Sequence, residues 1–249
     1  MPLPVLSIIC IFTPQPLKVV ANSDNSALFV NVKTIDERGL TRAAEMNLAG
    51  SGLANVVNTN NIEKTSSLFE NNSSRGRVFM FFSHPVRRIV HNYYKKSFDP
   101  ESEDYDSTIA EISLIDYAQS DMITDNLITR SLINDFNSPN ITSTDIEVAK
   151  DIIRRKIVVG IMEWLESSIT RVEKYYGWFG KTMKSPKTSI CHYRQIYKEA
   201  AHLLLHATPE WNSYVTQIVA ERNSADMEVY EYARDIFLQQ AALVKEVKH

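Results

Sequence analysis

A short polar stretch between an apolar run and an amphipathic segment is the strongest candidate for chemistry in this chain. The apolar run at 77–82 is followed by Pro85 and then by apolar residues at helical spacing, which predicts a strand, a tight turn and a helix. Such a helix directs unpaired N–H groups and the positive end of its dipole towards the turn, where phosphate or sulfate binds well. The turn Ser83-His84-Pro85 is the candidate anion site, and Arg87 and Arg88 in the first turn of the helix could add charge-assisted hydrogen bonds.

The same stretch also fits an ordinary strand–helix connection whose arginines face the solvent. Two other polar groups have alternatives of their own. His202 and His206 have the i, i+4 spacing of metal ligands, but no H-E-x-x-H order accompanies them, so a helix-surface pair is favoured and no metal site is predicted. Glu163 and Glu166 could act as a carboxylate pair, although helix-surface charges are commoner.

The elements that position these residues alternate along the chain. The apolar runs 77–82 and 156–162 each lead into an amphipathic helix, at 85–94 and at 164–176, and Gly177 is expected to end the second helix. This alternation predicts the α/β class, with the two runs as neighbouring parallel strands covered on both faces.

The two ends of the chain are predicted to differ in secondary structure. Four prolines in residues 1–27 predict an irregular segment, which leaves 28–249 as one domain. A capping box of Thr144 and Glu147 is expected to open a helix. A long helix closes the chain, and the residues expected to be buried along it are Val229, Tyr232, Ala233, Ile236 and Val244.

Length and composition exclude several classes of protein. The 249 residues are 44% apolar and 23% charged, as in a globular protein with a sizeable core. The net charge of −3 gives no basic field for nucleic acid, and two cysteines cannot make a disulfide scaffold or a zinc site by themselves. The most apolar run, 3–12, is shorter than the roughly 20 residues of a membrane span and lacks the basic start of a signal peptide.

The candidate turn belongs to a longer pattern that is similar to a known family. Residues 82–94, FSHPVRRIVHNYY, resemble the second cofactor motif of the sulfotransferases, F-R-[DH]-P-V-x-R-x-x-S-x-Y-Y. Further stretches resemble other motifs of that family in the same order, namely 113–118, 125–132, 149–178 and 223–240. The similar proteins are carbohydrate sulfotransferases near the uronyl 2-O group, most like algal versions.

This resemblance implies a P-loop-like three-layer αβα fold with a partly parallel sheet. It implies 3′-phosphoadenylyl sulfate (PAPS) as donor, a carbohydrate hydroxyl as acceptor, and location in the Golgi or the secretory lumen. A base would deprotonate the hydroxyl, and the sulfuryl group would transfer in line while positioned donors neutralise the developing charge. It also implies that Asp125, Asn126 and Arg130 line a sugar cleft, although Arg130 fits a structural ion pair equally well.

Two positions depart from the family pattern. Ser83 and His91 stand where the family has the arginine and the serine that bind the 3′-phosphate. Replacing an arginine by a neutral hydroxyl removes charge-assisted bonding of about 1.5–3 kcal/mol. The glycine-rich loop that holds the 5′-phosphosulfate in the family does not occur in these 249 residues. We therefore expect an incomplete donor site, and two alternatives stay open: an inactive sulfotransferase-like protein that binds acidic glycans or protein partners, and a helical interaction protein.

Overall fold

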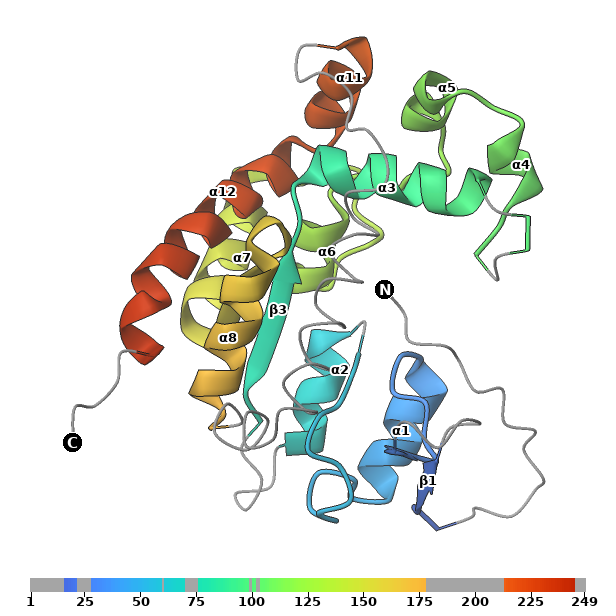
Figure 1. The fold of residues 1–249 in the computed structure, drawn as a ribbon. Helices are drawn as coiled ribbons and strands as arrows, with labels where there is room; N and C mark the ends of the chain where they lie inside the picture. Colours follow the sequence, from blue (N-terminus) through green and yellow to red (C-terminus); the bar gives the residue numbers. More distant parts are fainter. Residues whose placement is uncertain are drawn as a thin grey trace. The chain divides into compact units, whose positions relative to one another are not determined.

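The computed structural model describes residues 16–21, 28–59, 61–69, 76–98, 100–101, 104–177 and 213–244. The chain divides into two compact units, residues 1–76 and 77–249 (Figure 1). The domain boundary that the sequence predicts, between residues 27 and 28, lies inside the first unit.

The first unit combines a small hairpin with short helices. Its elements are β1 (Val19–Ala21), β2 (Leu28–Val30), α1 (Glu37–Glu45), α2 (Ile62–Ser66) and the 3₁₀ helix η1 (Ser67–Phe69). β1 lies within the segment expected to be irregular, and it pairs antiparallel with β2. Leu40, Ala43, Leu48 and Leu68 form the core of this unit. The Asp36 side chain caps α1 by accepting a hydrogen bond from Gly39 N at 2.8 Å.

The second unit is mostly helical around a small parallel sheet. Its first elements are β3 (Val78–Phe82), α3 (Pro85–Ser97), α4 (Ser107–Ala110), α5 (Leu114–Gln119), α6 (Leu127–Ile133) and α7 (Ser143–Lys156). Its later elements are β4 (Ile157–Ile161), η2 (Met162–Trp164), α8 (Leu165–Tyr175), α11 (Tyr214–Arg222), α12 (Ser224–Gln239) and η3 (Gln240–Val244). Among the described residues, no helix combines the length and apolar character needed to cross a bilayer.

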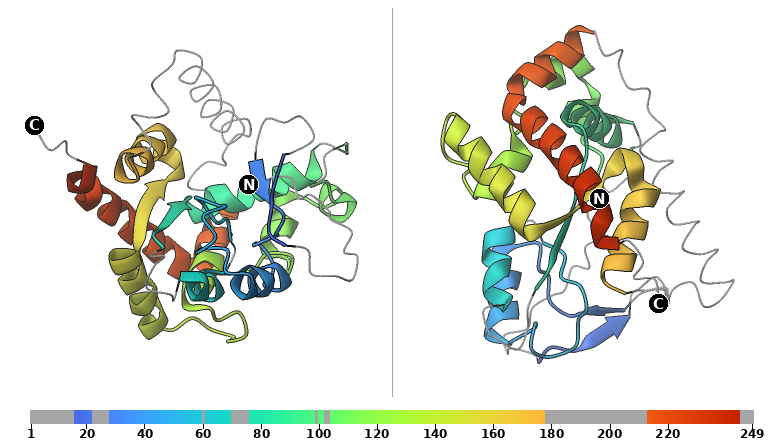
Figure 2. Two further views of the ribbon diagram at one scale, coloured as in Figure 1. Left: turned by 90° about the horizontal axis from the view of Figure 1, so that it is seen from below. Right: turned by 90° about the vertical axis from the view of Figure 1, so that its left-hand side faces the viewer.

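The two predicted strands are neighbours in one sheet. β3 and β4 run parallel, with Val78 opposite Ile157 and Phe82 opposite Ile161, and Figure 2 shows them side by side. The predicted α/β class and the parallel pairing are thus confirmed, whereas the three-layer arrangement stays a prediction. Every residue of β4 is buried, but β3 is half-buried up to Phe81, so the expectation that both strands are covered on both faces is wrong for β3.

Side chains close the outer edge of β4. Gln240 accepts a hydrogen bond from Val159 N at 2.9 Å and donates one to Ile157 O at 2.8 Å. The Ser168 hydroxyl accepts from Ile161 N at 2.8 Å and donates to the carbonyl of the same residue at 2.9 Å. These bonds satisfy backbone groups that a third strand would otherwise pair with.

The apolar face that the sequence predicts for α3 is confirmed. Val86, Ile89 and Val90 are buried in a cluster with side chains of α4, α5 and α11. Tyr93 and Tyr94 pack against the same cluster and are half-buried. The helix therefore directs its polar residues, including Arg87 and Arg88, away from this apolar cluster.

Some helix ends and buried positions differ from the prediction. The capping box of α7 is formed by Thr142 and Asp145 instead of Thr144 and Glu147, because the earlier threonine has extended backbone and the carboxylate that returns its hydrogen bond. Gly177 does end α8, with φ at +69°. On α12 Val229, Ala233 and Ile236 are buried as expected, but Tyr232 is only half-buried because Tyr230 takes the inward position. The Val244 side chain lies outside the described residues.

Candidate functional site

The candidate turn, Ser83 and His84, joins β3 to α3. Phe82 ends β3 with only 1% of its surface exposed, and Pro85 is the first residue of α3. Because β4 ends at Ile161, directly opposite Phe82, the chain leaves both strands at the same edge of the sheet. Ligands of parallel α/β sheets bind at the carboxyl ends of the strands, so the turn lies at an edge suited to binding.

Internal groups already use the backbone donors of this turn. His84 N donates a hydrogen bond to Glu163 Oε1 at 3.0 Å. Val86 N donates to His84 Nδ1 at 3.3 Å, and Pro85 has no N–H to offer. The expectation that this helix start presents unpaired N–H groups is therefore wrong for His84 and Val86. The sequence could not show this, because Glu163 lies 79 residues further along the chain.

Glu163 links the turn to the last long helix. Its second oxygen, Oε2, accepts a hydrogen bond from the Tyr230 hydroxyl at 3.0 Å. The Tyr230 ring lies edge-to-face against the His84 ring, with 5.2 Å between ring centroids. We call His84, Glu163 and Tyr230 the turn cluster. It joins residues that follow β3 and β4 with a residue from the second turn of α12.

An arginine and a tryptophan lie beside the turn cluster. The Arg234 guanidinium lies 5.2 Å from the centre of the Trp164 ring and 5.9 Å from that of Tyr230. It also forms an ion pair with Glu231 at 2.9 Å. A cation over aromatic faces adds about 0.5–1 kcal/mol at exposed sites, so Arg234 helps to hold α12 against the turn.

The turn cluster fixes the protonation of its two rings. Burial lowers the pKa of His84 from its ordinary 6.5, more than the carboxylates of Glu163 and Glu231 raise it. Burial and the adjacent Glu163 carboxylate raise the pKa of Tyr230 well above its ordinary 10.0. Since His84 Nδ1 accepts a hydrogen bond, the neutral imidazole carries its proton on Nε2. His84 and Tyr230 are therefore hydrogen-bond donors at neutral pH.

The lowered pKa of His84 predicts a pH-dependent stability. As the pH falls below 6.5, the unfolded chain takes up this proton before the folded chain does. The corresponding stabilisation is complete above that pH and is lost as the pH falls towards the lowered pKa. We expect the natural chain to lose more free energy of unfolding than the His84→Asn variant when urea unfolding is compared at about pH 7.5 and about pH 5.5.

The His84→Asn variant isolates this effect. Asparagine is among the best residues at a helix N-cap, so it can still accept the Val86 N–H, but it does not titrate. Every other histidine is the same in both proteins. An equal loss of stability on acidification in both would show that His84 is not the group responsible.

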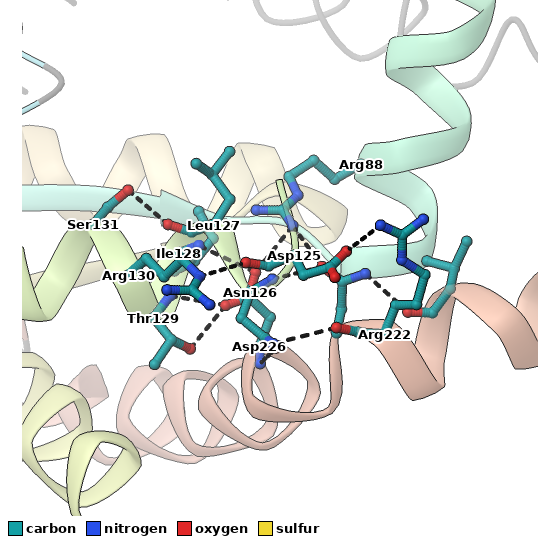
Figure 3. Close-up of polar contacts among 12 residues, drawn as sticks. Arg88, Asp125, Asn126, Leu127, Ile128, Thr129, Arg130, Ser131, Arg222 and Asp226 are labelled. Atoms are coloured by element: carbon teal, nitrogen blue, oxygen red, sulfur yellow. Dashed lines mark hydrogen bonds and ion pairs between the residues drawn. The ribbon is translucent and has the colours of Figure 1, made fainter. Parts of the chain in front are cut away.

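The Arg88 side chain extends into a buried polar network (Figure 3). Its Nη2 lies 2.9 Å from Asp226 Oδ2, and the Asp226 side chain is fully buried. The same carboxylate caps α6 by accepting hydrogen bonds from Ile128 N at 3.1 Å and Thr129 N at 2.8 Å. It also accepts from the Thr129 hydroxyl at 2.8 Å. The contacts of Arg88 in this structure are thus to α12, and they tie α3, α6 and α12 together.

Two of the residues expected to line a sugar cleft belong to the same network. Asn126 N donates to Asn223 Oδ1 at 3.0 Å, and Asn126 Oδ1 accepts from Asp226 N at 3.1 Å. Asp125 forms an ion pair with Arg222 at 2.9 Å. Asn126 has φ at +52°, a left-handed conformation that asparagine tolerates better than most residues. The structure therefore brings these residues together as a junction between α6 and α12.

Arg130 has a third set of contacts. It is 7% exposed, and it donates hydrogen bonds to the carbonyl oxygens of Asp125, Asp135 and Ser138 at 3.0, 3.2 and 2.8 Å. The sequence offered a structural ion pair as the alternative role of Arg130. The structure shows hydrogen bonds to loop carbonyls in that structural role instead. The sugar-binding role of Asp125, Asn126 and Arg130 stays a prediction, and their structural contacts are what the geometry shows.

Comparison with known proteins gives no further guide. No protein-family model, curated protein or solved structure matches this chain.

The remaining candidates fall into two groups. Arg87 and His91 lie on α3 and are half-buried. His202 and His206 lie outside the described residues. Within the described part of the chain, no group of three His, Cys, Asp or Glu side chains is placed to hold a metal ion. A surface groove beside α8 is lined by Glu166, Thr170, Arg171 and Lys174 and includes no residue of the turn cluster.

Sequence reasoning missed the central role of Glu163 and Tyr230. The sequence favours helix-surface charges for both Glu163 and Glu166, but only Glu166 is exposed. One signal could have found it: Glu163 follows the second predicted strand just as His84 follows the first. Neighbouring parallel strands end at the same edge, so the residues after them meet. Tyr230 had no comparable signal, because its position depends on how α12 packs.

Proposed function

We propose that this chain is a sulfotransferase-type protein in which the β3–α3 turn is the nucleotide-binding part of a weakened donor site. The observation that supports the proposal is the parallel pairing of β3 with β4, because the Ser83–His84 turn then follows the carboxyl end of a parallel strand, the edge at which such sheets commonly bind ligands. The order of the sequence motifs supports it, because the described residues of all five motifs lie in this one unit. The P-loop-like three-layer fold is part of the same proposal.

The chemistry requires donors that bind anionic oxygens. The acceptor hydroxyl of a carbohydrate attacks the sulfur of PAPS, loses its proton to a base, and 3′-phosphoadenosine 5′-phosphate leaves. In this chain His84 Nε2–H and the Arg87 guanidinium are the donors nearest the turn in sequence. Arg88 Nη1 is a buried donor with no hydrogen-bond partner in the described part of the chain, so Arg88 has capacity beyond its bond to Asp226.

A second candidate is an inactive sulfotransferase-like protein whose ligands are acidic glycans or protein partners instead of the nucleotide. Two specific observations favour it. Ser83 lacks the charge of the family's arginine, and the His84 N–H is already bonded to Glu163. Both reduce the affinity of the turn for a nucleotide phosphate.

Calorimetric titration with 3′-phosphoadenosine 5′-phosphate tests the proposal. We expect the natural chain to bind with a dissociation constant of about 1 mM or weaker, since each 1.4 kcal/mol lost is about tenfold in affinity. The Ser83→Arg, His91→Ser double variant restores the family's residues, and we expect it to bind at least about tenfold more tightly. Neither protein should transfer sulfate to a carbohydrate acceptor at a rate above background.

A matched control separates charge from position. Ser66→Arg adds the same charge to the first unit, on α2, and should leave nucleotide affinity unchanged. Micromolar binding by the natural chain would point to a working enzyme with a rearranged pocket. No gain in the double variant would overturn the assignment of this turn as a nucleotide site and leave the glycan-binding or interaction alternatives.

A further inference from the structure

Glu163 is an anion that the protein itself supplies to the β3–α3 turn. Its Oε1 lies 3.0 Å from His84 N, the backbone donor immediately before α3. Its Oε2 accepts a hydrogen bond from the Tyr230 hydroxyl at 3.0 Å, so both oxygens of the carboxylate are held in place. α3 has 13 residues, long enough for the positive end of its dipole to favour an anion here.

The two residues after His84 offer no free backbone donor to an incoming anion. Pro85 has none, and Val86 N is bonded to the His84 ring at 3.3 Å. Among residues 84–86, His84 N is therefore the backbone donor that a phosphate or sulfate oxygen would meet. A phosphate oxygen that accepts an N–H bond sits about 2.7–3.0 Å from the nitrogen, which is where Glu163 Oε1 already lies.

We infer that Glu163 is a resident carboxylate that occupies the phosphate position of the turn and excludes external phosphate or sulfate groups. The inference rests on the proposed function for the identity of the excluded ligand, and on the turn geometry for the exclusion itself. For an external anion to bind, the Glu163 side chain must leave His84 N and give up its bond to Tyr230.

The negative charge of Glu163 adds electrostatic repulsion to this exclusion. The charged groups that act on His84 are Glu163, Glu231, Arg87 and Arg234, two carboxylates and two guanidinium groups. Arg234 is paired with Glu231, so the Glu163 carboxylate is the anion that faces the turn directly. An incoming dianion is repelled by Glu163 even after that side chain has rotated away.

The test is a titration of four proteins with inorganic phosphate and with 3′-phosphoadenosine 5′-phosphate, followed through the backbone amide signal of His84. The proteins are the natural chain, Glu163→Gln, Glu163→Ala and the control Glu166→Gln. Glutamine keeps an acceptor for His84 N and removes the charge, whereas alanine also vacates the position. Glu166 is exposed and carries the same charge three residues away.

We expect both Glu163 variants to bind inorganic phosphate at least about tenfold more tightly than the natural chain, and Glu166→Gln to bind within about twofold of it. Two variants are used because Glu163→Ala also removes the bond to Tyr230 and could loosen α12. Far-ultraviolet circular dichroism confirms that each protein is folded before titration. Phosphate affinity that is unchanged or weaker in a folded Glu163→Ala variant, which vacates the position, overturns the inference.

The two ligands separate this inference from the proposed function. Tighter binding of phosphate but not of the nucleotide in the Glu163 variants would support the resident carboxylate and contradict a nucleotide site. Conversely, the Ser83→Arg, His91→Ser variant could bind the nucleotide with no further gain from Glu163→Gln. That result would support the nucleotide site and overturn the role of Glu163.

Discussion

Replacing Asp226 by asparagine is expected to lower the free energy of unfolding by about 3–5 kcal/mol. The Asp226 side chain is fully buried, forms an ion pair with Arg88 at 2.9 Å and caps the start of α6 through Thr129 N at 2.8 Å. Asparagine has nearly the same shape but no charge, so the variant leaves the Arg88 guanidinium without its counter-ion. Urea unfolding at neutral pH measures the loss.

Asp235→Asn is the matched control for this substitution. Asp235 lies on the same helix, α12, and is exposed. Its replacement should change the free energy of unfolding by no more than about 0.5 kcal/mol. Equal effects of the two substitutions would mean that the Asp226 network does not stabilise the fold, and that its residues are available for another role.

Replacing Phe82 by alanine is expected to lower the free energy of unfolding by about 3–5 kcal/mol. Phe82 is 1% exposed, ends β3 and pairs in register with Ile161 of β4. Removing its ring leaves a cavity next to the turn, because the neighbouring strand is hydrogen-bonded in place and can collapse only in part. Thermal and urea unfolding both report the effect.

Phe98→Ala serves as the control, because Phe98 is 75% exposed at the end of α3. We expect its effect on the free energy of unfolding to stay within about 0.5 kcal/mol. Phe82→Leu should lie between the natural chain and Phe82→Ala, since leucine fills part of the same volume. A Phe82→Ala variant as stable as Phe98→Ala would contradict the packing of β3 against the rest of the unit.

The elements with strong local patterns were predictable from the sequence. The runs at 77–82 and 156–162 are continuous and apolar, and each leads into a helix, so their parallel pairing followed from the alternation. The apolar face of α3 followed from spacing alone. The end of α8 at Gly177 was predictable because glycine readily adopts the positive φ that commonly ends a helix. The capping box of α7 was predicted two residues too late. Thr142 and Thr144 both have side chains that can cap a helix, and sequence spacing does not decide between them.

The candidate site was predictable in location but not in its contacts. The sequence by itself determined that Ser83 and His84 follow a strand and precede a helix, because local spacing decides that. Which polar groups meet there was decided only by tertiary structure. His84 N bonds to a carboxylate 79 residues away, and Asp226 N bonds to an amide 100 residues away. Hydrogen bonds act over a short range and need a defined orientation, so these contacts depend on how the helices pack. The spacing of apolar residues along the sequence predicts which helices form but not how they pack against one another.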